Sequence, residues 1–313
     1  MANAWGLKNK LFILLLIPGL AWLLCFFIFP IIIVFSMSFG QKVDIIGIDY
    51  NWSLHNYFRA FNGVYFFTLF KSIIISSITT FICLIVAIPV ALYISFSSTR
   101  IKSILLISIM LPLWTNLLIR TYSLIAILRT KGHINSSLEY LWEASNRALN
   151  FLNLANYNIF NNNFIPLDLM YNNFAIILGL FYIYVPFMII PIYLVLERFD
   201  RNLLEASYDL GANHFQTFFK VIMPIIIPGI ISGIILVFIP CLGSFIIPDL
   251  LGGADSQMIG NIIERQFKSA NDWPFGSALS FILIYMTIIV ISVRYIYSKL
   301  YSKFYIRGMY EKY

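Results

Sequence analysis

Few residues of this chain have the types and spacing that enzyme chemistry requires. The sequence contains no G-x4-G-K-[ST] phosphate-binding loop, no H-E-x-x-H and no G-x-S-x-G. Its cysteines, Cys25, Cys83 and Cys241, fall in apolar stretches without paired spacing, and its three histidines lie in separate loops. We therefore expect no catalytic residue, metal site or cofactor in this chain, and any ATP and Mg²⁺ on a separate subunit.

One charged segment between two long apolar stretches stands out. It runs Glu205-Ala206-Ser207-Tyr208-Asp209-Leu210-Gly211, and Val221-Ile222-Met223-Pro224 follows nine residues later. Leucines and acidic residues at helical spacing predict an amphipathic surface helix. Gly211 would end this helix, because glycine takes the left-handed conformation without steric cost, and Asn213 can cap the next one. A solvated helical hairpin between two spans is the simpler alternative.

The composition is that of an integral membrane protein. Apolar residues make up 60% of the 313, charged residues only 11%, and the net charge is +7. Several stretches approach the ~20 apolar residues that cross a bilayer. We predict a single membrane domain over residues 1–313 with six transmembrane helices, at about 11–38, 67–96, 103–128, 173–196, 219–247 and 277–298.

Basic residues predict the orientation of these spans. With the N-terminus inside, the shorter segments on the cytoplasmic side have the higher density of Lys and Arg, as the positive-inside rule requires. Both termini and the segment around Glu205 are then cytoplasmic. The outer segment 129–172 predicts an amphipathic surface helix followed by an Asn-rich loop at 150–163. The first span is too long for a cleavable signal, so we expect it to be retained.

Prolines interrupt the third, fourth and fifth predicted spans. In a membrane, a helix break persists only where protein or a water-lined cavity satisfies the freed backbone carbonyl. A single proline is better explained as a packing kink. Taken together, the five predict a pathway lined by irregular helices: Pro112, Pro186, Pro191, Pro228 and Pro240.

The charged segment resembles the coupling loop of ABC-importer permeases, whose pattern is E-A-A-x3-G-x9-I-x-L-P. This chain has Ser207, Val221 and Met223 where that pattern has Ala, Ile and Leu. The resemblance implies an all-α type I (MetI-like) permease with a coupling loop at 201–224 and a helical core at about 67–298. It implies that residues of this loop dock on the ATPase: Glu205, Ala206, Ser207, Asp209, Gly211 and Pro224.

Further segments are similar to spermidine/putrescine importer permeases of the PotB type, in register from about 100 to 280. They are Leu111-Pro112-Leu113-Trp114-Thr115-Asn116 with Ile119-Arg120-Thr121-Tyr122, Gly179-Leu180-Phe181-Tyr182 with Val185-Pro186-Phe187-Met188, Pro248-Asp249-Leu250-Leu251-Gly252-Gly253, Gly260-Asn261, and Asp272-Trp273-Pro274-Phe275-Gly276. The resemblance implies a bacterial cytoplasmic (inner) membrane permease for polyamines. The implied partners are a PotC-type second permease, a homodimeric PotA-type ATPase and an extracytoplasmic PotD-type binding protein.

A polyamine path needs groups that attract ammonium ions briefly. Asp249 at the outer end of the fifth span can supply charge, and aromatic faces can add cation–π attraction. The aromatic candidates are Trp114, Tyr122, Tyr182 and Trp273. Asp249 could instead cap a short helix, and the aromatics could belong to interfacial belts. Arg120 inside the third span should not line the binding site of a cation; it would pair with a carboxylate or repel cations.

Two alternatives remain open on sequence alone. An ABC permease of the same architecture could carry iron, thiamine or an organic phosphate. An ion-coupled secondary transporter would predict inverted repeats and several charges near the bilayer midplane, and of the charges only Arg120 lies there.

Overall fold

The computed structural model describes residues 15–43, 47–151, 164–253 and 256–310. The chain divides into two compact units, one of residues 1–66 with 262–289 and one of residues 67–261 with 290–313. The described residues are mainly helical, as the sequence predicts, with one two-stranded hairpin in addition. Whether the whole chain acts as one membrane domain stays a prediction.

The first unit combines the N-terminal span with the segment before the last long helix. Its elements are the helical span Leu15–Ser38, which includes a π-helical turn η1 (Leu24–Ile28) and α2 (Phe29–Ser38), the antiparallel strands β1 (Gln41–Val43) and β2 (Gly47–Asp49), α3 (His55–Ala60), most of α13 (Ile259–Lys268) and the start of α14 (Trp273–Tyr310). Arg59 joins α3 to α14 by an ion pair with Asp272 at 2.7 Å and by lying 4.0 Å from the centre of the Phe275 ring.

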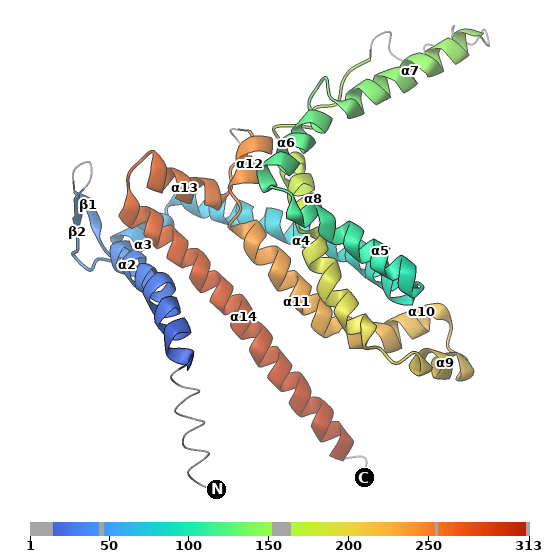
Figure 1. The fold of residues 1–313 in the computed structure, drawn as a ribbon. Helices are drawn as coiled ribbons and strands as arrows, with labels where there is room; N and C mark the ends of the chain where they lie inside the picture. Colours follow the sequence, from blue (N-terminus) through green and yellow to red (C-terminus); the bar gives the residue numbers. More distant parts are fainter. Residues whose placement is uncertain (1–14, 44–46, 152–163, 254–255, 311–313) are drawn as a thin grey trace. The chain divides into compact units, whose positions relative to one another are not determined.

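The second unit holds the remaining helices. They are α4 (Gly63–Phe96), α5 (Thr99–Met110), the 3₁₀ turn η2 (Leu111–Trp114), α6 (Leu117–Leu128), α7 (His133–Phe151), α8 (Asn173–Glu197), α9 (Asn202–Asp209), α10 (His214–Thr217), the π-helical turn η4 (Phe218–Ile222), α11 (Met223–Leu242) and α12 (Ile246–Leu251). Figure 1 shows α8 and α11 side by side, with α9 and α10 at one end and α12 at the other.

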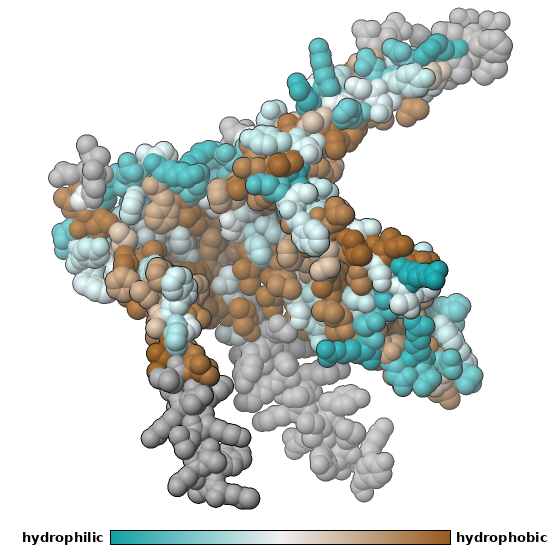
Figure 2. Space-filling model, in the orientation of Figure 1, coloured by the Kyte–Doolittle hydropathy of each residue, from teal (hydrophilic) through white to brown (hydrophobic). Residues whose placement is uncertain are grey.

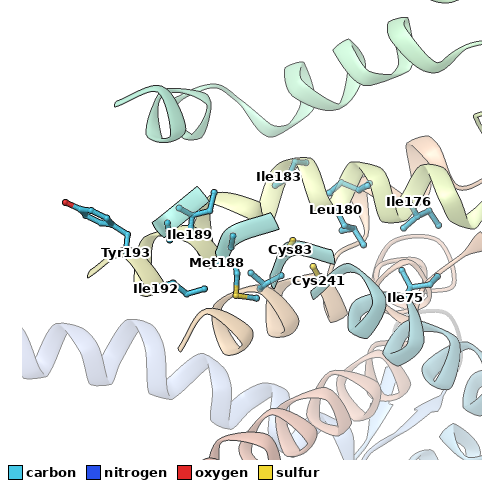
Figure 3. Packing of buried hydrophobic residues seen from close by; sticks show 14 of the residues in the cluster. Ile75, Cys83, Ile176, Leu180, Ile183, Met188, Ile189, Ile192, Tyr193 and Cys241 are labelled. Carbon is cyan, nitrogen blue, oxygen red and sulfur yellow. The ribbon is translucent and has the colours of Figure 1, made fainter. Parts of the chain in front are cut away.

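Glycines let α8 and α11 approach closely. A Cβ at Gly229 would lie 2.9 Å from the carbonyl oxygen of Pro191, and one at Gly233 would lie 2.5 Å from the sulfur of Met188. Small residues four positions apart are the usual means of close helix contact in membranes. Buried side chains of α4, α8 and α11 continue this contact into one core, which includes Ile75, Cys83, Leu180, Met188 and Cys241 (Figure 3).

Among the described residues, four helices are long and apolar enough to cross a membrane, and they match four predicted spans: Leu15–Ser38, Gly63–Phe96, Asn173–Glu197 and His214–Leu242. The last predicted span falls in α14, whose segment Trp273–Ile289 is apolar but short. The predicted third span is broken close to Pro112, where the sequence predicts an interruption. Thr99–Trp114 and Leu117–Arg147 meet at an angle of 98°, because Pro112 and the extended backbone at Thr115 and Asn116 end the first helix before Asn116 caps the second.

The prediction that prolines break three spans is correct only for Pro112. Pro186 and Pro191 lie inside the continuous helix α8, and Pro228 and Pro240 lie inside α11. Both helices stay unbroken through these prolines, so of the five predicted breaks only the one at Pro112 is present. The surface helix predicted within 129–172 is α7, while the Asn-rich loop lies largely outside the described residues.

Candidate functional site

The predicted amphipathic helix around Glu205 is α9. Asp200 accepts a hydrogen bond from the backbone N–H of Asn202 at 3.0 Å, and Glu205 adds negative charge to the first turn, where the helix dipole favours it. Leu204 packs against the core cluster, whereas Leu203 and Leu210 are exposed. The helix therefore has one side against the bundle and one side open.

Gly211 ends α9 as the sequence predicts. Its φ of +78° is left-handed. The backbone N–H of Ala212 donates to the carbonyl of Ser207 at 3.0 Å, and that of Gly211 donates to the carbonyl of Tyr208 at 2.8 Å, which is a Schellman motif. A Cβ at Gly211 would meet no atom within 4 Å, so backbone conformation rather than space requires glycine here.

The next helix is fastened to α9 by side chains. Asn213 caps it, accepting from the backbone N–H of Gln216 at 2.8 Å while Gln216 accepts from that of Asn213 at 3.2 Å. Ser207 is buried and its hydroxyl lies 3.0 Å from that of Thr217. The residue that departs from the family's second alanine therefore makes a bond that alanine cannot make. Pro224 follows the π-helical turn η4 at the start of α11.

The open side of α9 and α10 carries apolar and acidic groups together. Leu210 is 88% exposed and Phe215 is 73% exposed, and Leu203 on α9 is also exposed. Glu205 and Asp209 are also exposed, and neither forms an ion pair with any residue that the structure describes. Figure 2 shows hydrophilic residues gathered at this end of the unit and hydrophobic residues along α8 and α11. Such a surface suits contact with a protein outside the bilayer.

Sequence reasoning missed the contacts that anchor α9. Arg201 donates from Nη2 to the carbonyl of Ser95 at 3.1 Å and lies 5.6 Å from the centre of the Phe96 ring. The Ser95 hydroxyl donates to the carbonyl of Leu196 at 3.2 Å. Arg201 and Ser95 are 106 positions apart, so no local pattern could have linked them. The only sequence signal is an arginine at the start of an amphipathic helix.

At the opposite end of the unit, Asp249 lies on α12. Its side chain is exposed, and within the described ranges it forms no ion pair. The N-cap position of this helix is Phe245, whose side chain makes no cap hydrogen bond, and Asp249 lies inside the first turn. The structure therefore does not support the alternative that Asp249 caps this helix. Gly252 and Gly253 follow it, with Gly253 at φ +68° against Tyr171.

The aromatic candidates are exposed but do not form one cluster. Trp114 is 88% exposed at the 98° break, Tyr122 lies on α6 and Tyr182 on α8. The helices α6, α8 and α12 pack on one another, so Tyr122, Tyr182 and Asp249 belong to one helix group. Trp273 belongs to the other unit, where its ring faces Phe267. Their role in a substrate path stays a prediction.

Arg120 lies in the first turn and a half of α6, partly buried. Its Nε atom is buried and has no hydrogen-bond partner in the part of the chain that the structure describes. Among those residues Arg120 also forms no ion pair, so the carboxylate expected beside it is not found there.

Comparison with known proteins assigns this chain to a family of membrane proteins. The family model for binding-protein-dependent transport system inner membrane components matches residues 77–303. Two solved structures of a bacterial alginate ABC transporter share the fold, with TM-scores of 0.64 and 0.66 at 15% and 14% identity, covering 95% and 91% of this chain and 98% and 93% of theirs. The chain belongs to the family of binding-protein-dependent transport system inner membrane components, which are the non-catalytic permeases of ABC transporters.

Within this family, the chain is most usefully compared with permeases of known systems. The chain is 35% identical to the spermidine/putrescine transport system permease protein PotB of Escherichia coli K12 over 92% of this chain and 98% of that protein. It is 35% identical to PotB of Haemophilus influenzae over 90% and 92%. It is 29% identical to the inner membrane ABC transporter permease protein YdcU of Escherichia coli over 74% and 72%.

Proposed function

We propose that this chain is the permease subunit of an ATP-driven importer that moves polyamines, spermidine or putrescine, across the bacterial cytoplasmic membrane. The observation that carries the proposal is the 35% identity to PotB proteins over nearly the full length of both chains. The likeness to the alginate transporters supports the fold alone. The exposed carboxylate of Asp249 is consistent with a cationic substrate.

In this proposal the chain works as one membrane domain with three kinds of partner. A related second permease completes the pathway, two copies of an ATPase bind on the cytoplasmic side, and a polyamine-binding protein delivers substrate outside. The ATPase supplies the nucleotide chemistry, and both termini of this chain are cytoplasmic. The open side of α9 and α10, with Leu210, Phe215 and Glu205, is the ATPase contact.

Uptake would follow from rigid-body switching of the helix bundle. Closure of the ATPase dimer on ATP displaces α9, and the displacement passes through the capped turn at Gly211 and Asn213 into α11. The tightly packed pair α8 and α11 then moves as a unit, because close-packed helices shift between discrete arrangements.

The decisive experiment is uptake of labelled spermidine and putrescine by proteoliposomes that contain the assembled complex. We expect accumulation only with ATP inside and with the binding protein outside. The matched control is a complex whose ATPase lacks its phosphate-binding lysine. ATP-dependent uptake of iron, thiamine or an organic phosphate, with no uptake of either polyamine, would overturn the substrate assignment and leave the family assignment intact.

A further inference from the structure

The cytoplasmic ends of α4, α8 and α9 meet at one small group of side chains. Arg201 directly precedes α9, Ser95 lies in the last turn of α4, and Leu196 lies in the last turn of α8. Arg201 bonds the carbonyl of Ser95 at 3.1 Å, and the Ser95 hydroxyl bonds the carbonyl of Leu196 at 3.2 Å. Ser95 on α4 therefore contacts two other helices: its backbone oxygen accepts from Arg201 at the start of α9, and its hydroxyl donates to Leu196 on α8.

The groups that meet here interact favourably with one another. Carbonyls in the last turn of a helix lack intrahelical partners and carry the negative end of the helix dipole, so a guanidinium is a favoured donor there. The planar guanidinium also lies 5.6 Å from the centre of the Phe96 ring. It can therefore interact with this ring while it donates a hydrogen bond to the carbonyl of Ser95. A lysine could keep the charge but not both contacts.

The same end of the bundle carries a second connection. Lys102 near the start of α5 forms an ion pair with Glu197 at the end of α8 at 2.8 Å, and its ammonium lies 6.0 Å from the centre of the Tyr193 ring. The lysine side chain is only 18% exposed, which keeps solvent screening lower than at an open surface pair. The ends of α4, α5 and α8 are thus joined on the side where α9 begins.

We infer that Arg201 is a positioning residue that carries the displacement of α9 into α4 and α8. Residues after α9 connect it to α11 through α10 and η4, and Arg201 supplies the connection at the other end of the helix. Because α9 is held at both ends, its displacement moves α4, α8 and α11 together and does not separate α9 from them. This inference rests on the proposed function, because it assigns a role within ATP-driven switching.

The functional test compares Arg201→Gln, Arg201→Lys and Arg198→Gln in the assembled complex. Arg198 is the matched control, because it is exposed and lies three residues earlier in the same segment. For Arg201→Gln we expect unchanged ATPase co-purification, ATP hydrolysis within about twofold of wild type, and uptake per ATP lowered about fivefold or more. Arg201→Lys should lower the uptake per ATP hydrolysed less than Arg201→Gln does. The inference would be overturned if Arg201→Gln kept the wild-type uptake per ATP hydrolysed, or if this variant lost the ATPase from the complex.

A substrate-independent readout separates this inference from the proposed function. Spin labels on cysteines at Ser98 and Asn202, both exposed, report the distance between the end of α4 and the start of α9 in a chain whose native cysteines are replaced. We expect one narrow distance with and without ATP and vanadate in the otherwise native complex, and a broadened distribution with Arg201→Gln. Identical distributions would exclude the connection even if polyamine uptake is confirmed. A complex that transports no polyamine would refute the substrate alone.

Discussion

The hydroxyls of Ser207 and Thr217 lie 3.0 Å apart and are both buried where α9 folds back on the helix that follows it. The Ser207 hydroxyl also reaches the carbonyl of Leu204 at 2.8 Å. The contact joins α9 to α10.

This bond predicts a specific pattern of stability changes. Thr217→Val keeps the shape and removes one partner, and Ser207→Ala removes the other. Because the Ser207 hydroxyl donates to the carbonyl of Leu204, Thr217 is the donor to Ser207. Ser207→Ala leaves the buried Thr217 hydroxyl without its acceptor and should lose about 1 kcal/mol of unfolding free energy, whereas Thr217→Val leaves Ser207 bonded to Leu204 and should lose less. The double variant should recover part of the Ser207→Ala loss, because no buried hydroxyl is then left unpaired. Thermal unfolding of the purified complex in detergent measures this. Additive losses in the double variant would show that the two hydroxyls do not interact.

The turn at Gly211 should tolerate asparagine and reject valine. At φ +78° a β-branched residue is strained by roughly 1–2 kcal/mol, whereas Asn adopts this region more readily. We expect Gly211→Val to lose ATPase co-purification and uptake, and Gly211→Asn to keep most of both. Since a Cβ there would meet no atom within 4 Å, contacts of the Cβ itself do not explain a difference. Equal behaviour of the two variants would refute the conformational argument.

The exposed leucine beside this turn should matter for docking and not for folding. Leu210 is 88% exposed, so Leu210→Ser removes little buried area within this chain. We expect unchanged thermal stability of the isolated permease and reduced recovery of the ATPase in a pull-down. Glu205→Lys should act in the same direction by reversing an exposed charge. Leu141→Ser on α7, where the leucine is 62% exposed, is the control that should leave ATPase recovery unchanged.

Orientation can be tested without any ligand. Ser98 and Ser137 are exposed, whereas Ser207 and Ser256 are buried and would react poorly as cysteines. In a background without native cysteines, Ser98→Cys should react with an impermeant maleimide only in inside-out vesicles, and Ser137→Cys only in intact cells. Reversed labelling would place α9 outside and remove the ATPase contact.

Asp249 tests the substrate path. A carboxylate attracts a cation 4 Å away by about 1 kcal/mol in bulk water, which corresponds to about fivefold in affinity. Asp249→Asn should therefore slow uptake by up to about fivefold at low polyamine concentration, and added salt should narrow the difference. Asp168→Asn changes another exposed acid in a segment that is predicted to lie outside and should leave uptake unchanged. Equal uptake by the Asp249 variant and wild type at low ionic strength would exclude Asp249 from the path.

Local signals in the sequence determined much of this protein. The apolar stretches located four spans, and the helix end at Gly211 and the cap at Asn213 were correct. These features depend on interactions within a few residues, or on transfer of a continuous segment into lipid, so the sequence contains all the information they need.

Tertiary packing decided the features that depend on distant residues. Four of the five prolines predicted to break spans lie inside the unbroken helices α8 and α11, which approach each other closely at Gly229 and Gly233. The bond from Arg201 to Ser95 joins positions 106 residues apart, and the Ser207 hydroxyl finds its partner only once α9 folds back. A side chain's type shows which bonds it can make, but only the packed helices bring one particular carbonyl or hydroxyl within reach.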